Sequence, residues 1–204
     1  DGGQNTVKSP NENLGRELME LFTLGVGNYT EDDVKASARA LTGIKVVRSS
    51  GAVTYNTKNH DSGLMTILGK TSTFNSTSLT EHLLKQPRCA EFIAERLWFR
   101  FLSTGQPTSE LKNITAALGS TLDIGNAMRA LVNSSAFGSV SNEQVRAPVD
   151  WFVGATRALK IVPSGFSTNQ KLLRLLTALG QVPFDPPSVG GWPADEAWLT
   201  LGNA

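Results

Sequence analysis

Two glutamates one helical turn apart are the residues of this chain best suited to catalysis or to binding a ligand. Glu17 and Glu20 stand at i, i+3 in a stretch with helical spacing, so both carboxylates can point at one ligand, cation or guanidinium, and Arg16 stands beside them. Paired carboxylates can serve as a general acid and base, or as oxygen ligands of a metal ion. The alternative is a solvated face, on which Arg16 forms weak ion pairs with Glu12 and Glu20.

A histidine and an aspartate in a distant loop could complete such a site. His60 and Asp61 lie within residues 57–78, a segment rich in Ser, Thr, Asn and Gly that is predicted to form a long loop. Because the chain has only 2 histidines, a metal ion would have mostly oxygen ligands here, which favours a hard divalent cation. The other histidine, His82, is predicted to pack or cap within an apolar helical turn.

Arginines offer a second kind of binding chemistry. Arg96 and Arg100 stand one turn apart on a predicted helix, where they could hold an anionic ligand or the carboxylates of a partner. The alternative for this pair is ion pairing with Glu91 and Glu95 on the same helix. Arg16, on the first helix, is a third candidate ligand-binding residue.

The segment from Pro183 to Pro193 combines rigid prolines and flexible glycines with two large aromatic residues. One interpretation is a structural belt, in which Phe184 and Trp192 cover the end of the helices. The other is a recognition loop for a sugar or a proline-rich peptide, with Trp192 as the binding residue. An aromatic platform beside a rigid loop suits either ligand.

Composition and motifs exclude several classes of function. A net charge of +1 with 18% charged residues provides no basic footprint for nucleic acid. The longest apolar runs are far too short to span a bilayer. The sequence has no Gly-Lys phosphate loop, dinucleotide fingerprint, His-Glu-x-x-His or Cys-x-x-Cys motif. The single cysteine, Cys89, rules out an internal disulfide and is predicted to be a buried structural thiol.

The two glutamates lie on a helix with clear start and stop signals. Ser9 and Glu12 have the spacing of a capping box, Pro10 suits the first helical position, and Gly25 supplies a left-handed residue that ends the helix. The expected core face consists of the apolar residues at helical spacing, which are Leu14, Leu18, Leu21 and Phe22.

The rest of the chain reads mostly as helix. A second helix is expected from about Glu31 to Thr42, with Thr30 and Asp33 as its capping pair and Gly43 as its stop. Its apolar stripe is Val34, Ala38 and Leu41. Two β-prone runs, at residues 44–48 and 52–56, predict a hairpin with the only strands of the fold. Further helices are expected over residues 79–86, 88–102, 109–118, 123–133, 147–159 and 168–179.

These elements predict a mainly α fold, an irregular multi-helix bundle with a small β-hairpin and long loops. At 204 residues the chain is long enough to form a single helical domain with a real core. The expected parts are a helical pair (8–43), a hairpin and loop (44–78), a helical core (79–179) and a Pro/Gly/Trp loop (180–204).

Four ordered blocks of residues resemble a bacterial family known as domain of unknown function eighteen-hundred. The first block runs from Asn11 to Gly43 and contains Arg-Glu-Leu-Met-Glu-Leu near its start. The second runs from His60 to Gly69, and the third from Ala90 to Phe101. The fourth joins Gly180–Phe184 to Gly191–Pro193. Two positions depart from the family pattern, since Phe22 stands where the family often has His, and Met65 where it often has Lys. The resemblance implies a periplasmic or secreted protein, of which this chain is the central to C-terminal portion.

The same resemblance implies partners. Family genes often lie beside those of an exported, sulfatase-like family, domain of unknown function fifteen-hundred-and-one, and the missing N-terminal half of a longer family member is a second candidate. The expected function is therefore an exported helical scaffold or partner-binding protein. The alternative is a hydrolase-type enzyme with an acid/base or hard-metal site. Its residues would be Glu17, Glu20, His60 and Asp61.

Overall fold

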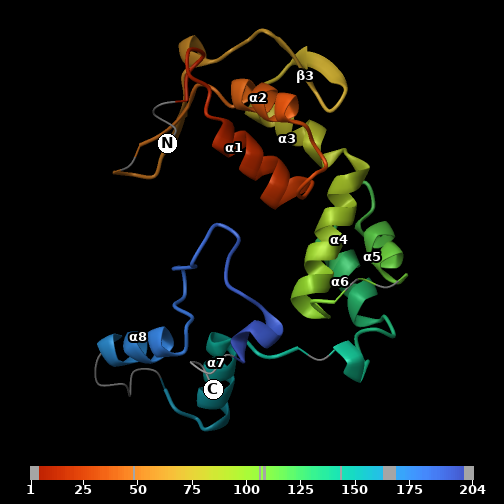
Figure 1. Cartoon of the computed structure of the whole chain (residues 1–204), viewed down its shortest axis with the longest axis vertical. Helices are drawn as coiled ribbons and strands as arrows, with labels where there is room; N and C mark the ends of the chain where they lie inside the picture. The colour runs from red at the N-terminus through yellow and green to blue at the C-terminus, as the bar shows by residue number, and fades with distance from the viewer. Residues whose placement is uncertain are drawn as a thin grey trace. The chain divides into compact units, whose positions relative to one another are not determined.

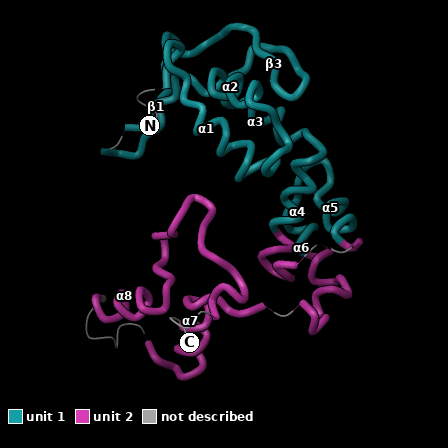
Figure 2. Tube along the Cα trace, viewed as in Figure 1, with its two compact units in different colours: residues 1–96, 111–128 teal, residues 97–110, 129–204 magenta. Residues whose placement is uncertain are grey.

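The computed structural model of the chain describes residues 5–47, 49–105, 107, 109–142, 144–162 and 169–199. These residues form eight α-helices and two antiparallel strand pairs, so the predicted mainly α class is confirmed (Figure 1). They divide into two compact units, which Figure 2 shows in teal and magenta. Unit 1 comprises residues 1–96 and 111–128, and unit 2 comprises residues 97–110 and 129–204. No helix among the described residues is both long and apolar enough to cross a membrane.

The first helix starts later than predicted. α1 (Glu12–Glu17) has Asn11 as its N-cap, and the side-chain oxygen of Asn11 accepts a hydrogen bond from Asn13 N. Ser9 instead pairs with Thr6 in an isolated β-bridge, so the predicted Ser9 capping box is wrong. Asn is itself a preferred N-cap residue, because its oxygen can satisfy an orphan N–H of the first turn.

The second helix begins as the sequence predicts. In α2 (Glu31–Ala40), Thr30 and Asp33 form the expected capping box. The second carboxylate oxygen of Asp33 accepts a 2.7 Å hydrogen bond from Leu68 N, which ties the start of α2 to a distant turn. Burial opposes ionisation of Asp33, but the hydrogen bonds from Leu68 and Thr30 outweigh it and lower the pKa of this carboxyl. Gly43 follows the helix in a left-handed conformation, with φ +86°.

The face of the first helix that packs on α2 differs from the predicted one. Met19 is fully buried, whereas Leu14 and Phe22 are 46% and 66% exposed, so the predicted core face is wrong at those two positions. Gly15 explains the change, because a Cβ at this glycine would lie only 3.1 Å from Ala38 N of α2. The helices therefore approach along the row of Gly15 and Met19, and larger side chains are directed away from this contact.

A π-helical segment extends the first helix. This segment, η1 (Leu18–Thr23), follows α1 without a break, and its wider turn moves later residues around the helix axis. Leu24 N and Gly25 N both donate to Met19 O at its end. Gly25 has φ +81°, which confirms it as the left-handed residue that ends the helix.

Two hairpins are present where the sequence predicts one. The predicted hairpin is confirmed, and the second lies inside the predicted loop 57–78, so the expectation of strands only near residues 44–56 is wrong. The turn between the second pair is Leu68-Gly69, in which both residues have positive φ, at 47° and 77°. Leucine rarely adopts this conformation, but here its side chain packs against the core. The strands are β1 (Ile44–Val46), β2 (Val53–Tyr55), β3 (Leu64–Ile67) and β4 (Lys70–Thr73), with η2 (Thr57–Asn59) between the hairpins.

The remaining helices lie close to their predicted positions. α3 (Ser76–Leu84) starts three residues early, because Asn75 and Ser78 form a capping box that the prediction missed. The others begin and end within two residues of expectation: α4 (Pro87–Phe101), α5 (Leu111–Leu118), α6 (Ile124–Val132), α7 (Pro148–Ala158) and α8 (Asn169–Ala178). Some positions of the predicted strand 44–48, helical core 79–179 and loop 180–204 lie outside the described residues. They are Arg48 and residues 106, 108, 143, 163–168 and 200–204.

Unit 1 contains a continuous hydrophobic core. It is formed by buried side chains of η1, α2, β3, α3 and the start of α4, and the predicted burial of Cys89 is confirmed. Burial also raises the pKa of the Cys89 thiol, as expected for a structural cysteine. The core residues are Met19, Leu24, Val34, Ala36, Ala40, Leu41, Met65, Ile67, Phe74, Leu79, Leu83 and Cys89.

Candidate functional site

The first helix connects its acidic and basic residues to the start of α2. Glu20 Oε2 accepts a 2.6 Å hydrogen bond from the Tyr29 hydroxyl. Burial, followed by this bond, raises the pKa of Tyr29 above its usual value. Arg16 donates two hydrogen bonds, of 2.8 and 2.7 Å, to the exposed Glu31 carboxylate. Glu17 is half-buried.

His60 and Asp61 are held by residues of α2 and its C-terminal end. His60 Nδ1 lies 3.1 Å from the Thr42 carbonyl oxygen, which can only accept, so Nδ1 is the donor. Asp61 Oδ2 accepts a 2.7 Å hydrogen bond from Arg39 Nε, and Oδ1 accepts one of 2.9 Å from Gly63 N. The bond to Arg39, followed by that to Gly63, lowers the pKa of Asp61. These contacts fix the loop rather than leaving its polar groups free.

The two pairs of predicted catalytic residues thus have different partners. Within the described part of the chain, no hydrogen bond joins Glu17 or Glu20 to His60 or Asp61. Nor do the described residues include a group of three or more His, Cys, Asp or Glu side chains placed to hold a metal ion. The shared acid/base or cation site therefore stays a prediction of the sequence.

The paired state of Asp61 predicts a pH-dependent stability. Asp61→Asn should lower the free energy of unfolding near pH 7 by about 1–2 kcal/mol, because the neutral amide loses the ion pair with the partly exposed Arg39 and supplies only one acceptor oxygen for Arg39 Nε and Gly63 N. The folded-state pKa of Asp61 is lowered, so its contribution is complete above the unfolded value of about 3.9 and is lost as pH falls through the folded value. The difference in unfolding free energy between the two proteins should shrink below about pH 4 in urea titrations.

Asp32→Asn is the matched control for this measurement. The Asp32 side chain is 94% exposed and its carboxylate lies 3.8 Å from Lys35 Nζ. Such exposed pairs contribute about 0–1 kcal/mol, so this variant should unfold almost like the wild type at every pH. A constant stability difference for Asp61→Asn from pH 7 down to about pH 3 would contradict the assigned role of its carboxylate.

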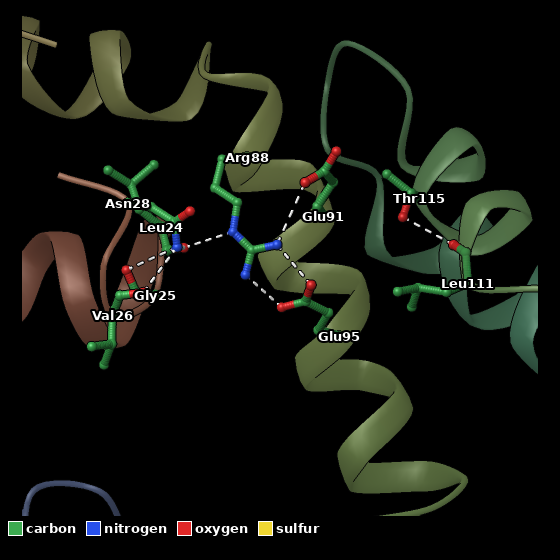
Figure 3. Close-up of polar contacts among 9 residues, drawn as sticks. All are labelled: Leu24, Gly25, Val26, Asn28, Arg88, Glu91, Glu95, Leu111 and Thr115. Carbon is green, nitrogen blue, oxygen red and sulfur yellow. Dashed lines mark hydrogen bonds and ion pairs between the residues drawn. The ribbon is translucent and has the colours of Figure 1, made fainter. Parts of the chain in front are cut away.

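Arg88, which the sequence analysis did not single out, forms ion pairs along α4 (Figure 3). Its Nη1 and Nη2 donate to the Glu95 carboxylate at 2.7 and 2.6 Å, and Nη1 also lies 3.4 Å from Glu91. Its Nε donates a 2.9 Å hydrogen bond to the Leu24 carbonyl oxygen, which Asn28 also contacts. Arg88 therefore joins α4 to the end of η1. The sequence indicates these pairs through spacing, because Glu91 and Glu95 follow Arg88 by about one and two helical turns.

The predicted ligand-binding residues Arg100 and Trp192 line the same pocket of unit 2. This apolar pocket has a volume of about 420 Å³. Arg96 is exposed and belongs to unit 1, whereas Arg16 is paired with Glu31. The residues that line the apolar pocket are Arg100, Val149, Asp150, Gln181, Pro183, Phe184, Pro186 and Trp192.

The loop after α8 presents an aromatic side chain to solvent. Phe184 is 100% exposed, so the predicted structural belt is wrong for this residue. It also has φ +67°, a left-handed conformation that costs a residue with a side chain about 1–2 kcal/mol. In the same loop, the buried Gln181 accepts a 2.8 Å hydrogen bond from Val149 N through Oε1, which anchors the loop to the first turn of α7.

A second, polar pocket of unit 2 has a volume of about 150 Å³. Arg100 and Asp150 line it as well as the apolar pocket, and its described charged lining also includes Arg146 and Asp195. Asp195 is a structural carboxylate. Its Oδ1 accepts a 2.7 Å hydrogen bond from Val145 N, and its Oδ2 accepts one of 2.9 Å from a threonine hydroxyl.

Comparison with known proteins adds one finding. No curated protein and no solved structure matches the sequence or the fold. The family model described as "Protein of unknown function (DUF1800)" matches residues 1–204, in agreement with the resemblance of the four blocks. The chain therefore belongs to the DUF1800 family.

Proposed function

We propose that this chain is a binding scaffold whose recognition surface is the apolar pocket of unit 2, and that it binds an extended, proline-containing segment of a partner protein. The observation that carries this proposal is the complete exposure of Phe184 at the rim of a pocket that Trp192 also lines. A large aromatic side chain that is fully exposed, on a backbone in a costly conformation, is typical of recognition sites.

The lining of the pocket favours a peptide over a sugar. Five of the eight described lining residues are apolar, namely Val149, Pro183, Phe184, Pro186 and Trp192. A sugar needs polar partners around its whole ring, whereas the described polar lining is Gln181, whose oxygen is engaged by the backbone, and Arg100 and Asp150, which also line a second pocket. Proline-rich segments dock in aromatic-lined grooves and lose little conformational entropy, because they are extended before they bind.

The enzyme alternative has less support. Glu20 and Asp61 each accept a short hydrogen bond from a side chain other than the proposed catalytic partners. The periplasmic or secreted location, and a sulfatase-like protein as the partner, stay predictions of the family resemblance. A binding role is consistent with any of these settings.

Selection from a displayed library of random peptides tests the proposal. Immobilised wild-type chain should enrich peptides that contain proline and apolar residues, and the Phe184→Ser variant should fail to retain them. The library display keeps both peptide ends joined to a carrier, so terminal charges are absent from the selection. Recovery of the same peptides on both proteins, or no enrichment over an empty surface, would refute the proposed function.

A further inference from the structure

The apolar and polar pockets of unit 2 are neighbours. Arg100 and Asp150 line both of them, so the two pockets adjoin at these side chains. The surface is apolar at Phe184 and Trp192 and charged at Arg146. A ligand that fills this surface must therefore satisfy two kinds of chemistry within a few residues.

The two arginines of the surface have no partners in the chain that the structure describes. Arg100 and Arg146 are exposed and make no hydrogen bond or ion pair with a described residue. In unit 1, by contrast, Arg39 and Arg88 are each joined to a carboxylate at 2.7 Å or less. A guanidinium presents a planar fork of donors that fits a carboxylate, and in the polar pocket two such forks are available.

The acidic residues described in the lining of the polar pocket form no ion pair with either arginine. Both carboxylate oxygens of Asp195 accept hydrogen bonds from other groups, through Oδ1 from Val145 N and through Oδ2 from the Thr104 hydroxyl. Asp150 is exposed in the first turn of α7, where a negative charge also interacts with the helix dipole. Among the described lining residues, two guanidinium groups thus share the pocket with a single carboxylate that has no hydrogen bond to a described residue.

We infer that the bound segment carries an aspartate or glutamate next to its apolar residues, and that Arg100 and Arg146 hold this carboxylate. The inference rests on the proposed function and specifies its ligand, an acidic and proline-containing peptide. The ligand group is an acidic side chain rather than a chain terminus, and the selection tests this choice because both ends of each displayed peptide are joined to the carrier. Arg100 then marks the junction between the apolar and acidic parts of the segment.

Peptides recovered by the selection are the probes for this inference. Most should contain an acidic residue close to proline and an apolar residue. Replacing that residue with its amide should weaken binding to the wild-type chain about tenfold, a loss typical of a charge-assisted contact. The double variant Arg100→Gln, Arg146→Gln should lose the same factor for the acidic peptide and show no further loss for the amide peptide. Raising NaCl from about 50 to 500 mM should weaken the acidic peptide only on the wild-type chain.

Arg157→Gln with Lys160→Gln is the matched control, because it removes the same charge from exposed residues of unit 2 that line neither pocket. This variant should bind the acidic peptide within about twofold of the wild type. Equal losses in the two double variants, or recovered peptides without acidic residues, would overturn the inference. If the inference fails in this way but peptide binding still requires Phe184, the proposed function stands. If peptide binding does not require Phe184, the proposed function and the inference are both refuted.

Discussion

Gly43→Ala is expected to lower the free energy of unfolding by at least about 3 kcal/mol. Gly43 has φ +86°, and a Cβ there would lie 2.7 Å from the Asn56 carbonyl oxygen. The backbone at this point cannot move away easily, because Gly43 O accepts a 2.8 Å hydrogen bond from Asn56 N and Gly43 N donates to Asn5 O. Alanine therefore adds both a strained backbone conformation and a clash with a fixed carbonyl group.

Gly51→Ala separates these two effects. Gly51 also has a positive φ, +69°, but a Cβ there would have no neighbour within 4 Å. Only the conformational term remains, so this variant should lose about 1 kcal/mol. All 4 tryptophans lie in unit 2, so unfolding of unit 1 should be followed by circular dichroism or amide exchange rather than by tryptophan fluorescence. Equal losses for the two variants would show that the Asn56 contact does not constrain the fold.

Helix positions were predictable because their signals are local. Thr30 and Asp33 are three residues apart and cap α2 through contacts with each other, and Pro87 and Gly25 act within a single turn. The later helices each bury one face, so their apolar residues recur at helical spacing. This spacing predicted the first and last residues of α4 to α8 to within two positions. Signals of this kind need no knowledge of the rest of the chain.

The second hairpin and the buried face of α1 depend instead on distant contacts. The Leu68-Gly69 turn lacks the usual asparagine or aspartate, and it is stabilised by Asp33 and by core packing of the Leu68 side chain. Likewise, Gly15 determines which face of α1 is buried, because only a residue without a side chain allows α2 to come so close. Neither effect could be derived from sequence periodicity.

The candidate site was predictable in part. The sequence indicated Trp192 and Arg100 as binding residues, and both line the apolar pocket. It did not reveal Arg146, because no local pattern connects an arginine before α7 with another on α4. It also grouped acidic residues that the fold pairs with other side chains, since the partners of Asp61 and Glu20 come from α2 and the segment before it.

Phe184→Ser is expected to weaken binding of a selected peptide at least about thirtyfold, equivalent to 2 kcal/mol, the loss typical of an aromatic hot spot. The folded chain should keep its stability, because the Phe184 side chain is fully exposed and removing it leaves no cavity. Serine also tolerates the positive φ no worse than phenylalanine does. Fluorescence titration measures the change in affinity, and thermal unfolding checks that the fold is intact.

Val189→Ser is the control for this variant. Val189 is an apolar residue of the same loop and is 81% exposed, but it does not line the apolar pocket. Its replacement should change the affinity by less than about threefold, since it removes a surface residue outside the proposed contact. A similar loss in both variants would indicate a general effect on the loop instead of a specific role for Phe184.

The most direct test of the binding surface is a titration of ¹⁵N-labelled chain with a selected peptide, followed through the four tryptophan indole N–H signals. Trp192 lines the apolar pocket, whereas Trp151 is 57% exposed but lines neither pocket, and Trp98 is almost completely buried. We expect the Trp192 signal to shift in a saturable manner, with the Trp151 and Trp98 signals unchanged. A saturating peptide that leaves Trp192 unperturbed would place the binding surface elsewhere and contradict the proposed function.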